Sequence, residues 1–433
     1  MHPLPDVAER VSLAATSTST ATNAARTADS EAGRAVMCTG APHDALKNPH
    51  SAPSEPVVRR AQVCVCGRPV FFGNSVCLGC GTALGYDPER AMLHALAPSG
   101  CNGEWQPAVA PAGRAPRFRR CANLDTAAAC NWLVAMNDAP DPLNEGAPMF
   151  APLCRSCGLT RMLPDLSVPE NARWWRLIEQ AKRRLVSSLM GLRLPVESKL
   201  EQSGLGLAFD LLRTLPGGAP ILTGHDHGVI TLDVSEADDA TREQRRLQFG
   251  ESYRTLLGHL RHESGHYYWQ RLVDGSGWLA PYRAIFGDDR QDYAEALQRH
   301  YREGPAPDWG SRHVSAYASS HPWEDWAETW AHYLHLVDTL DTAHRFGLDG
   351  EHVGLSYERY DVADLGDGGG ADGGLFLRLL NDWMELTGVL NELSRSMGVP
   401  DFYPFVLSVA TVRKLFFVHR VVTDASGHRI DSS

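Results

Sequence analysis

The sequence predicts an α+β protein that is mostly helical and that opens with a small cysteine-rich module. Three observations support this prediction. All but one of the ten cysteines lie between Cys64 and Cys157. From Pro169 onward, apolar residues recur at helical spacing. The β-branched run from Gly228 to Val234 is the clearest strand, and it stands just ahead of a long helical stretch.

The elements expected after the cysteine-rich module follow from apolar periodicity, caps and breakers. In chain order they are a helix from Pro169 to before Pro195, a strand over 228–234, a helix from about Arg242 to Val273 capped by Thr241, a helix starting near His321 and Pro322, a glycine-rich loop from Gly366 to Gly374, and a helical pair over 375–397 and 407–422. Within the helix that starts at His321, Trp323, Trp326 and Trp330 are spaced for one buried stripe, so we expect them to pack in the core.

A chain of 433 residues is longer than a domain with a single hydrophobic core usually is, so two or three folded parts are expected. We predict a disordered tail over 1–58, a cysteine-rich module over 59–167 and a larger domain over 168–433, because the opening residues are rich in Ala, Ser, Thr and Pro. No apolar run is long enough for a membrane span, and the start lacks a secretory signal, so we expect a cytoplasmic protein without membrane contact.

The net charge of −11 argues against nucleic acid as a partner, because phosphate binding depends on basic surfaces. Local basic runs such as Arg117, Arg119 and Arg120 are explained more simply as a solvated face.

The cysteines fall into two groups of four that are spaced for metal binding. In a reducing compartment such crowding favours thiolate ligands over disulfides. In the first group, two close pairs of cysteines joined by a hairpin-length loop predict a zinc ribbon. The second group is spaced less regularly. For each group the alternative is that the cysteines are buried and bind no metal. The first set is Cys64, Cys66, Cys77 and Cys80, and the second is Cys121, Cys130, Cys154 and Cys157. Cys38 and Cys101 receive no role. Such closed sites stabilise small modules and leave no position open for chemistry.

The run His262-Glu263-Ser264-Gly265-His266 is an HExxH pattern. On a helix it sets two imidazoles one turn apart on one face, where a divalent metal can bridge them, and it places Glu263 beside a metal-bound water. The simpler alternative is that these histidines only cover a polar surface. Nearby His259, His321, His332 and His335 are expected to be surface or hydrogen-bonded histidines rather than ligands.

A catalytic zinc site needs a third protein ligand. An extension of the helix to HExxHxxGxxH is excluded, because Trp269 and Leu272 stand where Gly and His would be required. Glu324 and Glu328 are four residues apart on one face of a later helix. One of them can bind the metal, and the other can hold the free imidazole N–H of a ligand histidine.

Several motifs resemble those of the glutamate-zincin metallopeptidases. Together they are similar to a bacterial family of zinc-binding metallopeptidases with an N-terminal zinc ribbon. The motifs are Cys66–Asn74 (CGRPVFFGN), Cys77–Gly81 (CLGCG), His262–Trp269 (HESGHYYW) and Tyr317–Glu328 (YASSHPWEDWAE). The resemblance implies a zincin-like domain preceded by a rubredoxin-like zinc ribbon. It also implies that Glu324 binds zinc, that Glu328 supports a histidine, and that Tyr317 stabilises the oxyanion.

We therefore expect zinc-dependent hydrolysis of peptide bonds, with Zn²⁺ held by His262, His266 and Glu324 and with Glu263 as general base. One catalytic zinc and one or two structural zincs are expected, with a peptide or protein as substrate and with the ribbon as a surface for a protein partner. Two alternatives stay open. In one, the chain is an adaptor whose ribbons bind nucleic acid or protein and whose zincin domain is only a scaffold. In the other, it hydrolyses amides that are not peptides.

Overall fold

The computed structural model describes residues 61–100, 103–109, 115–136, 152–215, 217–219, 221–249, 254–348, 353–354, 357–366 and 369–427. These residues all belong to one compact unit that spans 54–433. The tail predicted over 1–58 and the two cysteines without a role, Cys38 and Cys101, lie outside the described residues.

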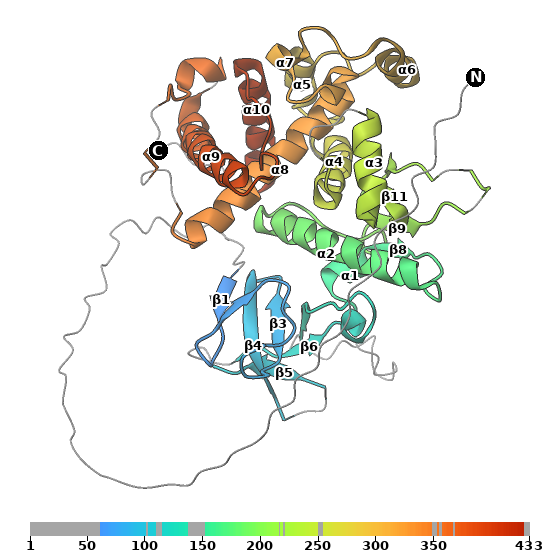
Figure 1. The fold of residues 1–433 in the computed structure, drawn as a ribbon, viewed down its shortest axis with the longest axis vertical. Coiled ribbons are helices and arrows are strands. Elements are labelled where there is room, and N and C mark those ends of the chain that lie inside the picture. The colour runs from blue at the N-terminus through green and yellow to red at the C-terminus, as the bar shows by residue number, and fades with distance from the viewer. Residues whose placement is uncertain are drawn as a thin grey trace, which may run out of the picture. The chain divides into compact units, whose positions relative to one another are not determined.

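The first part of the described chain is built from short antiparallel strands, drawn in blue and cyan in Figure 1. A two-stranded sheet pairs β1 with β2, and a five-stranded sheet has the order β3-β4-β5-β6-β7. Phe72, Tyr86 and Trp132 form an aromatic core beside these sheets, with ring centroids 4.6 to 6.5 Å apart. The strands are β1 (Ala61–Val63), β2 (Pro69–Phe71), β3 (Leu84–Asp87), β4 (Met92–Pro98), β5 (Trp105–Pro107), β6 (Phe118–Arg120) and β7 (Leu133–Ala135).

The remainder combines one four-stranded sheet with a larger set of helices, which confirms the α+β prediction. The strand order is β10-β11-β9-β8; β8, β9 and β11 run parallel, and β10 is antiparallel at the edge. The strands are β8 (Thr160–Met162), β9 (Ala208–Leu212), β10 (Gly224–Asp226) and β11 (Val229–Asp233). The helices are α1 (Arg155–Gly158), α2 (Pro169–Gly191), α3 (Asp239–Phe249), α4 (Leu256–Tyr268), α5 (Leu279–Phe286), α6 (Tyr293–Glu303), α7 (Trp309–Arg312), α8 (Pro322–Arg345), α9 (Gly370–Ser396) and α10 (Val409–Ala425). Short 3₁₀ turns are η1 (Ala122–Asp125), η2 (Val234–Ala237), η4 (Tyr317–Ser319) and η6 (Val362–Leu365).

The strand expected over 228–234 is β11, which is an interior strand of this sheet. The strand at the sheet edge ahead of α4 is β10, which the sequence did not indicate because its residues, Gly224-His225-Asp226, have low strand propensity. It pairs with β11 through a turn in which His227 and Gly228 have positive φ angles of 44° and 82°.

The single helix predicted from Arg242 to Val273 is wrong. Thr255 has an extended backbone, with φ −117° and ψ 155°, and its side chain accepts a hydrogen bond from Gly258 N as the N-cap of α4. Arg254 next to it contacts Glu236 of η2, which fixes this junction. Helical spacing continues on both sides, so periodicity alone hides the break. The predicted end is confirmed, because the π-helical turn η3 (Trp269–Val273) follows α4.

The helix α8 begins where the sequence predicts. The ring of His321 accepts from Trp323 N as N-cap, and Pro322 occupies the first turn. Trp326 and Trp330 are fully buried, as expected. Trp323 is not part of that stripe: it is only partly buried, and its ring lies against His266 with centroids 3.8 Å apart.

The glycine run over 366–374 was expected to be a loop throughout, yet α9 already begins at Gly370. Gly373 lies close to Leu365 and Phe416, where an added Cβ would be 3.1 Å from the Leu365 side chain. Tertiary packing therefore overrides the low helix propensity of glycine here. The second helix of the predicted pair, α10, begins at Val409 with Ser408 as N-cap.

The helices α4 and α8 pack at very short distance around Gly265. A Cβ at this position would lie 2.9 Å from Ala327 Cα and 3.2 Å from Trp330 Cβ. The carbonyl of Gly265 also accepts a hydrogen bond of 2.8 Å from Trp326 Nε1. Only glycine permits this approach, which sets the distance between the HExxH run and the two glutamates.

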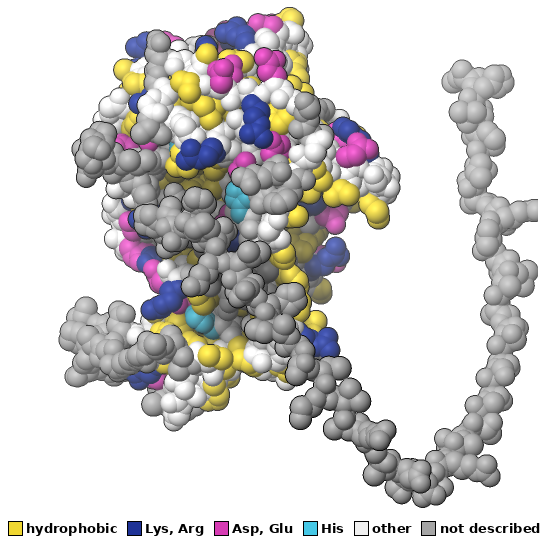
Figure 2. All heavy atoms as spheres, turned by 90° about the vertical axis from the view of Figure 1, so that its left-hand side faces the viewer, with side chains coloured by type: hydrophobic (Ala, Val, Ile, Leu, Met, Phe, Trp, Pro, Cys, Tyr) yellow, Lys and Arg dark blue, Asp and Glu magenta, His cyan; other side chains and the backbone are white. Residues whose placement is uncertain are grey.

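Among the described helices, none combines the length and the apolar composition that a membrane span requires. On the face shown in Figure 2, acidic and basic side chains are interspersed with apolar ones. Mixed charge of this kind is typical of a solvated protein surface.

We predict that Gly265→Ala lowers the free energy of unfolding by about 1–3 kcal/mol, because the methyl group would force α4 away from α8. Urea denaturation followed by circular dichroism measures this. Gly374→Ala is the matched control, since it also lies in a helix but has only the Arg378 guanidinium 3.9 Å from the added Cβ. That variant should be as stable as the parent or more stable by roughly 0.5–1 kcal/mol. Equal stability of Gly265→Ala and the parent would contradict the close-contact argument.

Candidate active site

Three side chains from α4 and α8 converge on one point. Glu324 Oε2 lies 3.0 Å from His262 Nε2 and 3.5 Å from His266 Nε2. One potential ligand atom from each of the three residues lies within 4.8 Å of the others, and all three side chains are buried. The structure thus brings together the three residues that the sequence predicts as a metal-binding set.

The residues present fit a metal ion. Glu324 is 1% exposed, and its Oε2 atom, although close to both imidazoles, has no hydrogen bond of acceptable geometry. A buried carboxylate oxygen is costly without a partner. Two imidazole nitrogens and one such oxygen are the donor set that zinc prefers, and they leave a fourth position open. Burial raises the pKa of Glu324, but the charge of His266 and the contacts with both imidazoles lower that pKa well below its usual range.

Glu328 holds the other nitrogen of His262. Its Oε1 atom is 2.7 Å from His262 Nδ1, and its Oε2 atom accepts a hydrogen bond of 2.6 Å from Ser315 Oγ. With Nδ1–H donated to Glu328, His262 presents Nε2 toward Glu324. The two glutamates therefore contact opposite sides of the same imidazole.

Glu263 is buried beside this set. Its Oε1 atom lies 3.4 Å from His259 Nε2, and its Oε2 atom has no hydrogen-bond partner. Burial raises the pKa of Glu263, but the hydrogen bond with His259 and the charges of His262 and His266 outweigh it, so the pKa lies below its usual value. The carboxylate is therefore anionic near neutral pH and has one oxygen available.

The first turn of α8 is also fixed by a buried ion pair with α10. Lys414 Nζ of α10 donates to Asp325 Oδ2 at 2.6 Å, and His313 Nδ1 lies 3.1 Å from the same oxygen. Because Asp325 follows Glu324 directly, this pair holds the backbone from which the Glu324 carboxylate extends.

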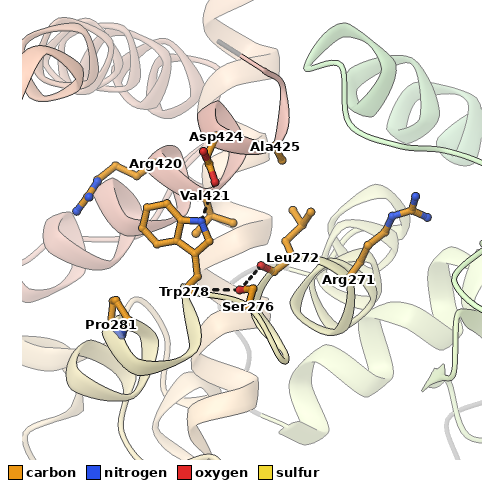
Figure 3. A pocket seen from close by; sticks show the side chains of 10 residues that line it. Arg271, Leu272, Ser276, Trp278, Pro281, Arg420, Val421, Asp424 and Ala425 are labelled. Atoms are coloured by element: carbon orange, nitrogen blue, oxygen red, sulfur yellow. Dashed lines mark hydrogen bonds between the residues drawn. The ribbon is translucent and has the colours of Figure 1, made fainter. Parts of the chain in front are cut away.

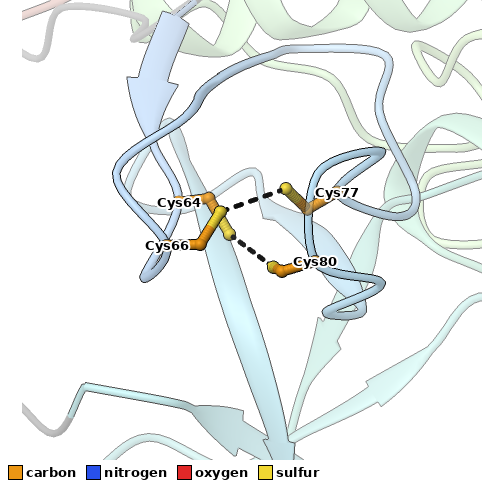
Figure 4. Close-up of side chains that lie close together, drawn as sticks. All are labelled: Cys64, Cys66, Cys77 and Cys80. Carbon is orange, nitrogen blue, oxygen red and sulfur yellow. Dashed lines mark hydrogen bonds between the residues drawn. The ribbon is translucent and has the colours of Figure 1, made fainter. Parts of the chain in front are cut away.

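The eight predicted cysteine ligands form two separate clusters, and each has four sulfur ligand atoms within 4.8 Å of one another. In the first, shown in Figure 4, the Cys64 and Cys80 sulfurs and the Cys66 and Cys77 sulfurs are 3.7 Å apart. In the second, Cys130 and Cys154 are 3.6 Å apart. A tetrahedron with Zn–S bonds of about 2.3 Å has edges of about 3.8 Å, whereas a disulfide has S–S of about 2.05 Å. The spacing fits metal-bound thiolates.

The two clusters differ in their surroundings. Cys66 and Cys80 of the first cluster are exposed, whereas all four cysteines of the second are buried. The second cluster also lies against β8 and α2: two residues separate Cys157 from β8, and Cys157 Sγ is 3.9 Å from Glu179 Oε2 of α2. Arg183 of α2 donates to the carbonyl of Ala128, in the loop between Cys121 and Cys130.

Comparison with known proteins agrees with this arrangement. Residues 171–421 match the model of the family described as "Putative zinc-binding metallo-peptidase", and residues 61–168 match a zinc-ribbon domain. The chain belongs to this metallopeptidase family. Uncharacterised proteins of Mycobacterium bovis and Mycobacterium tuberculosis are 40% identical over 362 residues, which cover 83% of this chain and 94% of theirs. No solved structure matches the chain.

Tyr317, which the sequence predicts to stabilise the oxyanion, lies beside His262. Its ring centroid is 5.9 Å from that of His262. Burial is the main reason that the pKa of Tyr317 lies well above its usual value, and the charge of Glu324 adds to it. The hydroxyl therefore keeps its proton and is able to donate it in a hydrogen bond.

Three contact residues were not predicted from the sequence. Tyr293 of α6 donates a hydrogen bond of 2.6 Å to Glu324 Oε1, Ser315 binds Glu328, and His259 contacts Glu263. The spacing of four residues between His259 and Glu263 on one helix face was a usable signal for the last. Tyr293 and Ser315 come from other segments, so no spacing indicates them.

The other expected histidines are hydrogen-bonded, as predicted. His332 Nδ1 is 2.6 Å from Tyr403 Oη, and His335 Nδ1 is 2.5 Å from the Arg261 guanidinium. Ser264 accepts from Trp330 Nε1 at 3.1 Å, which explains a polar residue inside the motif.

A cavity of about 510 Å³ lies away from these residues, between η3, the start of α5 and the end of α10 (Figure 3). Trp278 lines it and donates from Nε1 to Asp424. Arg271 and Arg420 also line it, but their guanidinium groups extend to opposite sides (Figure 3). They do not converge on one ligand position.

We predict that Cys154→Ser destabilises the whole chain, by on the order of 3 kcal/mol or more, because the second cluster is buried and joined to β8 and α2. Thermal unfolding and zinc content measure the effect. The control is Cys66→Ser, in the exposed first cluster. It should lower zinc content while the main unfolding transition stays close to that of the parent. Equal shifts in the two variants would argue against a difference between the clusters.

Proposed function

We propose that this chain is a zinc-dependent peptidase whose metal is held by His262, His266 and Glu324. The observation that carries the proposal is the convergence of both imidazole Nε2 atoms on Glu324 Oε2, at 3.0 and 3.5 Å, beside the free oxygen of Glu263. Membership of a metallopeptidase family supports the same activity. A surface histidine pair would not require a buried carboxylate between the rings.

When bound there, zinc supplies a Lewis acid that lowers the pKa of a water and polarises the carbonyl of the substrate. Glu263 then acts as general base: it takes a proton from the attacking water and passes it to the leaving amine. Its low pKa keeps it anionic at neutral pH, and its unpaired Oε2 atom is the oxygen that can accept the proton.

The remaining side chains have supporting roles. Glu328, held by Ser315, fixes the tautomer and orientation of His262, which is the role expected of a carboxylate behind a ligand histidine. Tyr317 keeps its proton and donates a hydrogen bond to the negative charge that develops on the carbonyl oxygen. The two cysteine clusters each hold one structural zinc, which gives one catalytic and two structural ions.

We predict that Glu263→Gln keeps zinc at the active site and lowers kcat by about 10²-fold or more, because glutamine cannot take a proton. Mass-spectrometric profiling of a peptide library measures turnover, and zinc content is measured on the same samples. Glu303→Gln, an exposed glutamate at the end of α6, is the control and should be as active as the parent. If Glu263→Gln cleaves as fast as the parent, Glu263 is not the base.

We also predict that Glu324→Ala weakens zinc binding more than Glu328→Ala does. Loss of a ligand removes a metal bond, whereas loss of the hydrogen-bonded support costs about 10–100-fold in affinity. Competition with a chromophoric chelator, on protein whose cysteine clusters remain loaded, gives both constants. The reverse order would transfer the ligand role to Glu328.

A further inference from the structure

Tyr293 contacts Glu324 from outside the motifs that the proposed function uses. It is the first residue of α6, and its hydroxyl donates to Glu324 Oε1 at 2.6 Å. Glu324 Oε2 faces the two imidazoles instead. The two oxygens of one carboxylate are therefore assigned to different partners: one to a tyrosine and the other to the histidine pair.

The position of Tyr293 is fixed by contacts with the start of α8. Its ring meets the rings of His321 and Trp323 edge to face, at centroid distances of 5.4 and 5.5 Å. Those two residues stand on either side of Pro322 at the N-terminus of the helix that carries Glu324. His321 Nε2 also lies 3.3 Å from the carbonyl of Gln291, two residues before Tyr293.

The helix that carries Tyr293 is capped independently of the active site. Asp292 accepts from Glu295 N as N-cap of α6. Tyr293 itself is 37% exposed, so its ring is not part of the hydrophobic core. Loss of its hydroxyl alone should therefore not unfold the chain, whereas it would leave Glu324 Oε1 without the donor seen here.

A carboxylate can bind a metal through one oxygen or through both. A short hydrogen bond to one oxygen occupies one of its two lone pairs and fixes its direction. It disfavours binding through both oxygens, because bidentate binding would require Oε1 to turn toward the metal. With Oε1 held, His262, His266 and Glu324 would offer a metal two nitrogens and one oxygen, and a fourth tetrahedral position would stay open for water. Outer hydrogen bonds of this kind tune the affinity of a metal site.

We propose that Tyr293 is a positioning residue that restricts Glu324 to single-oxygen metal binding. This inference rests on the proposed function only in that Glu324 binds the metal.

The test compares Tyr293→Phe with the parent and with Tyr301→Phe in the full chain. Tyr301 is on the same helix, but it is 61% exposed and its ring packs on His300. Each protein keeps its cysteine clusters loaded with zinc, while a mild chelator removes the active-site ion. Zinc affinity is then measured by competition. Co²⁺ is added to separate samples, and the visible spectrum of Glu324→Ala is subtracted to isolate the active-site band.

We expect Tyr293→Phe to bind zinc about 10–100-fold more weakly than the parent. Its cobalt band should weaken, since visible absorption of Co²⁺ falls as the coordination number rises above four. Tyr301→Phe should match the parent in both, and all three should unfold at the same temperature. Tyr293→Phe with the affinity and cobalt band of the parent would overturn the inference.

The outcomes also separate the inference from the proposed function. If the parent binds one labile zinc, and Tyr293→Phe weakens it, but no peptide is cleaved, then the positioning role stands and the peptidase activity fails. If Glu324→Ala binds zinc as tightly as the parent, then Glu324 is not a ligand, and both proposals fail.

Discussion

The contact between α4 and α8 at Gly265 is the constraint on which the candidate active site depends. The absence of a side chain lets Ala327 approach the backbone of α4, and Trp326 binds the Gly265 carbonyl. On both helices the residues next to this contact are the polar ones: His262, Glu263 and His266 on α4, and Glu324 and Glu328 on α8. The separation of two helix axes thus decides whether a carboxylate of ordinary length reaches both imidazoles.

This arrangement concentrates charge in a place where charge is unfavourable. Glu263 and Glu324 are buried, and burial alone would raise both of their pKa values. The histidines lower them again, so the carboxylates remain anionic. A fold that needed only stability would gain from apolar residues at these positions. A buried cluster of opposite charges in which one carboxylate oxygen, Glu263 Oε2, has no hydrogen-bond partner is characteristic of a functional site.

Local patterns in the sequence were sufficient for the parts of the site that lie within one motif. The HExxH spacing placed His262 and His266 on one helix face. The spacing of four residues likewise placed Glu324 and Glu328 together, because residues four apart lie on the same side of a helix. The start of α8 near His321 and Pro322 and the strand β11 also follow from local chemistry. The contacts of Tyr293 and Ser315 with the glutamates could not be predicted from local patterns, because tertiary packing brings these residues together. The break at Thr255 was hidden for a related reason: a capping threonine between two helical stretches looks like one more position in the period.

Only two residues, Gly158 and Leu159, lie between Cys157 and β8, and this proximity has a consequence for how the chain folds. The strands β8 and β9 are parallel neighbours, and the segment that connects them in the sequence contains α2. They can therefore pair only after this long connection has folded back. Parallel pairing of this kind is slow, because the entropy of closing the loop is lost before the strand contacts compensate for it. An ion held by the cluster of Cys121, Cys130, Cys154 and Cys157 would anchor the beginning of that crossover against α2. We therefore expect the rate of sheet assembly during biosynthesis to follow the supply of metal to the nascent chain.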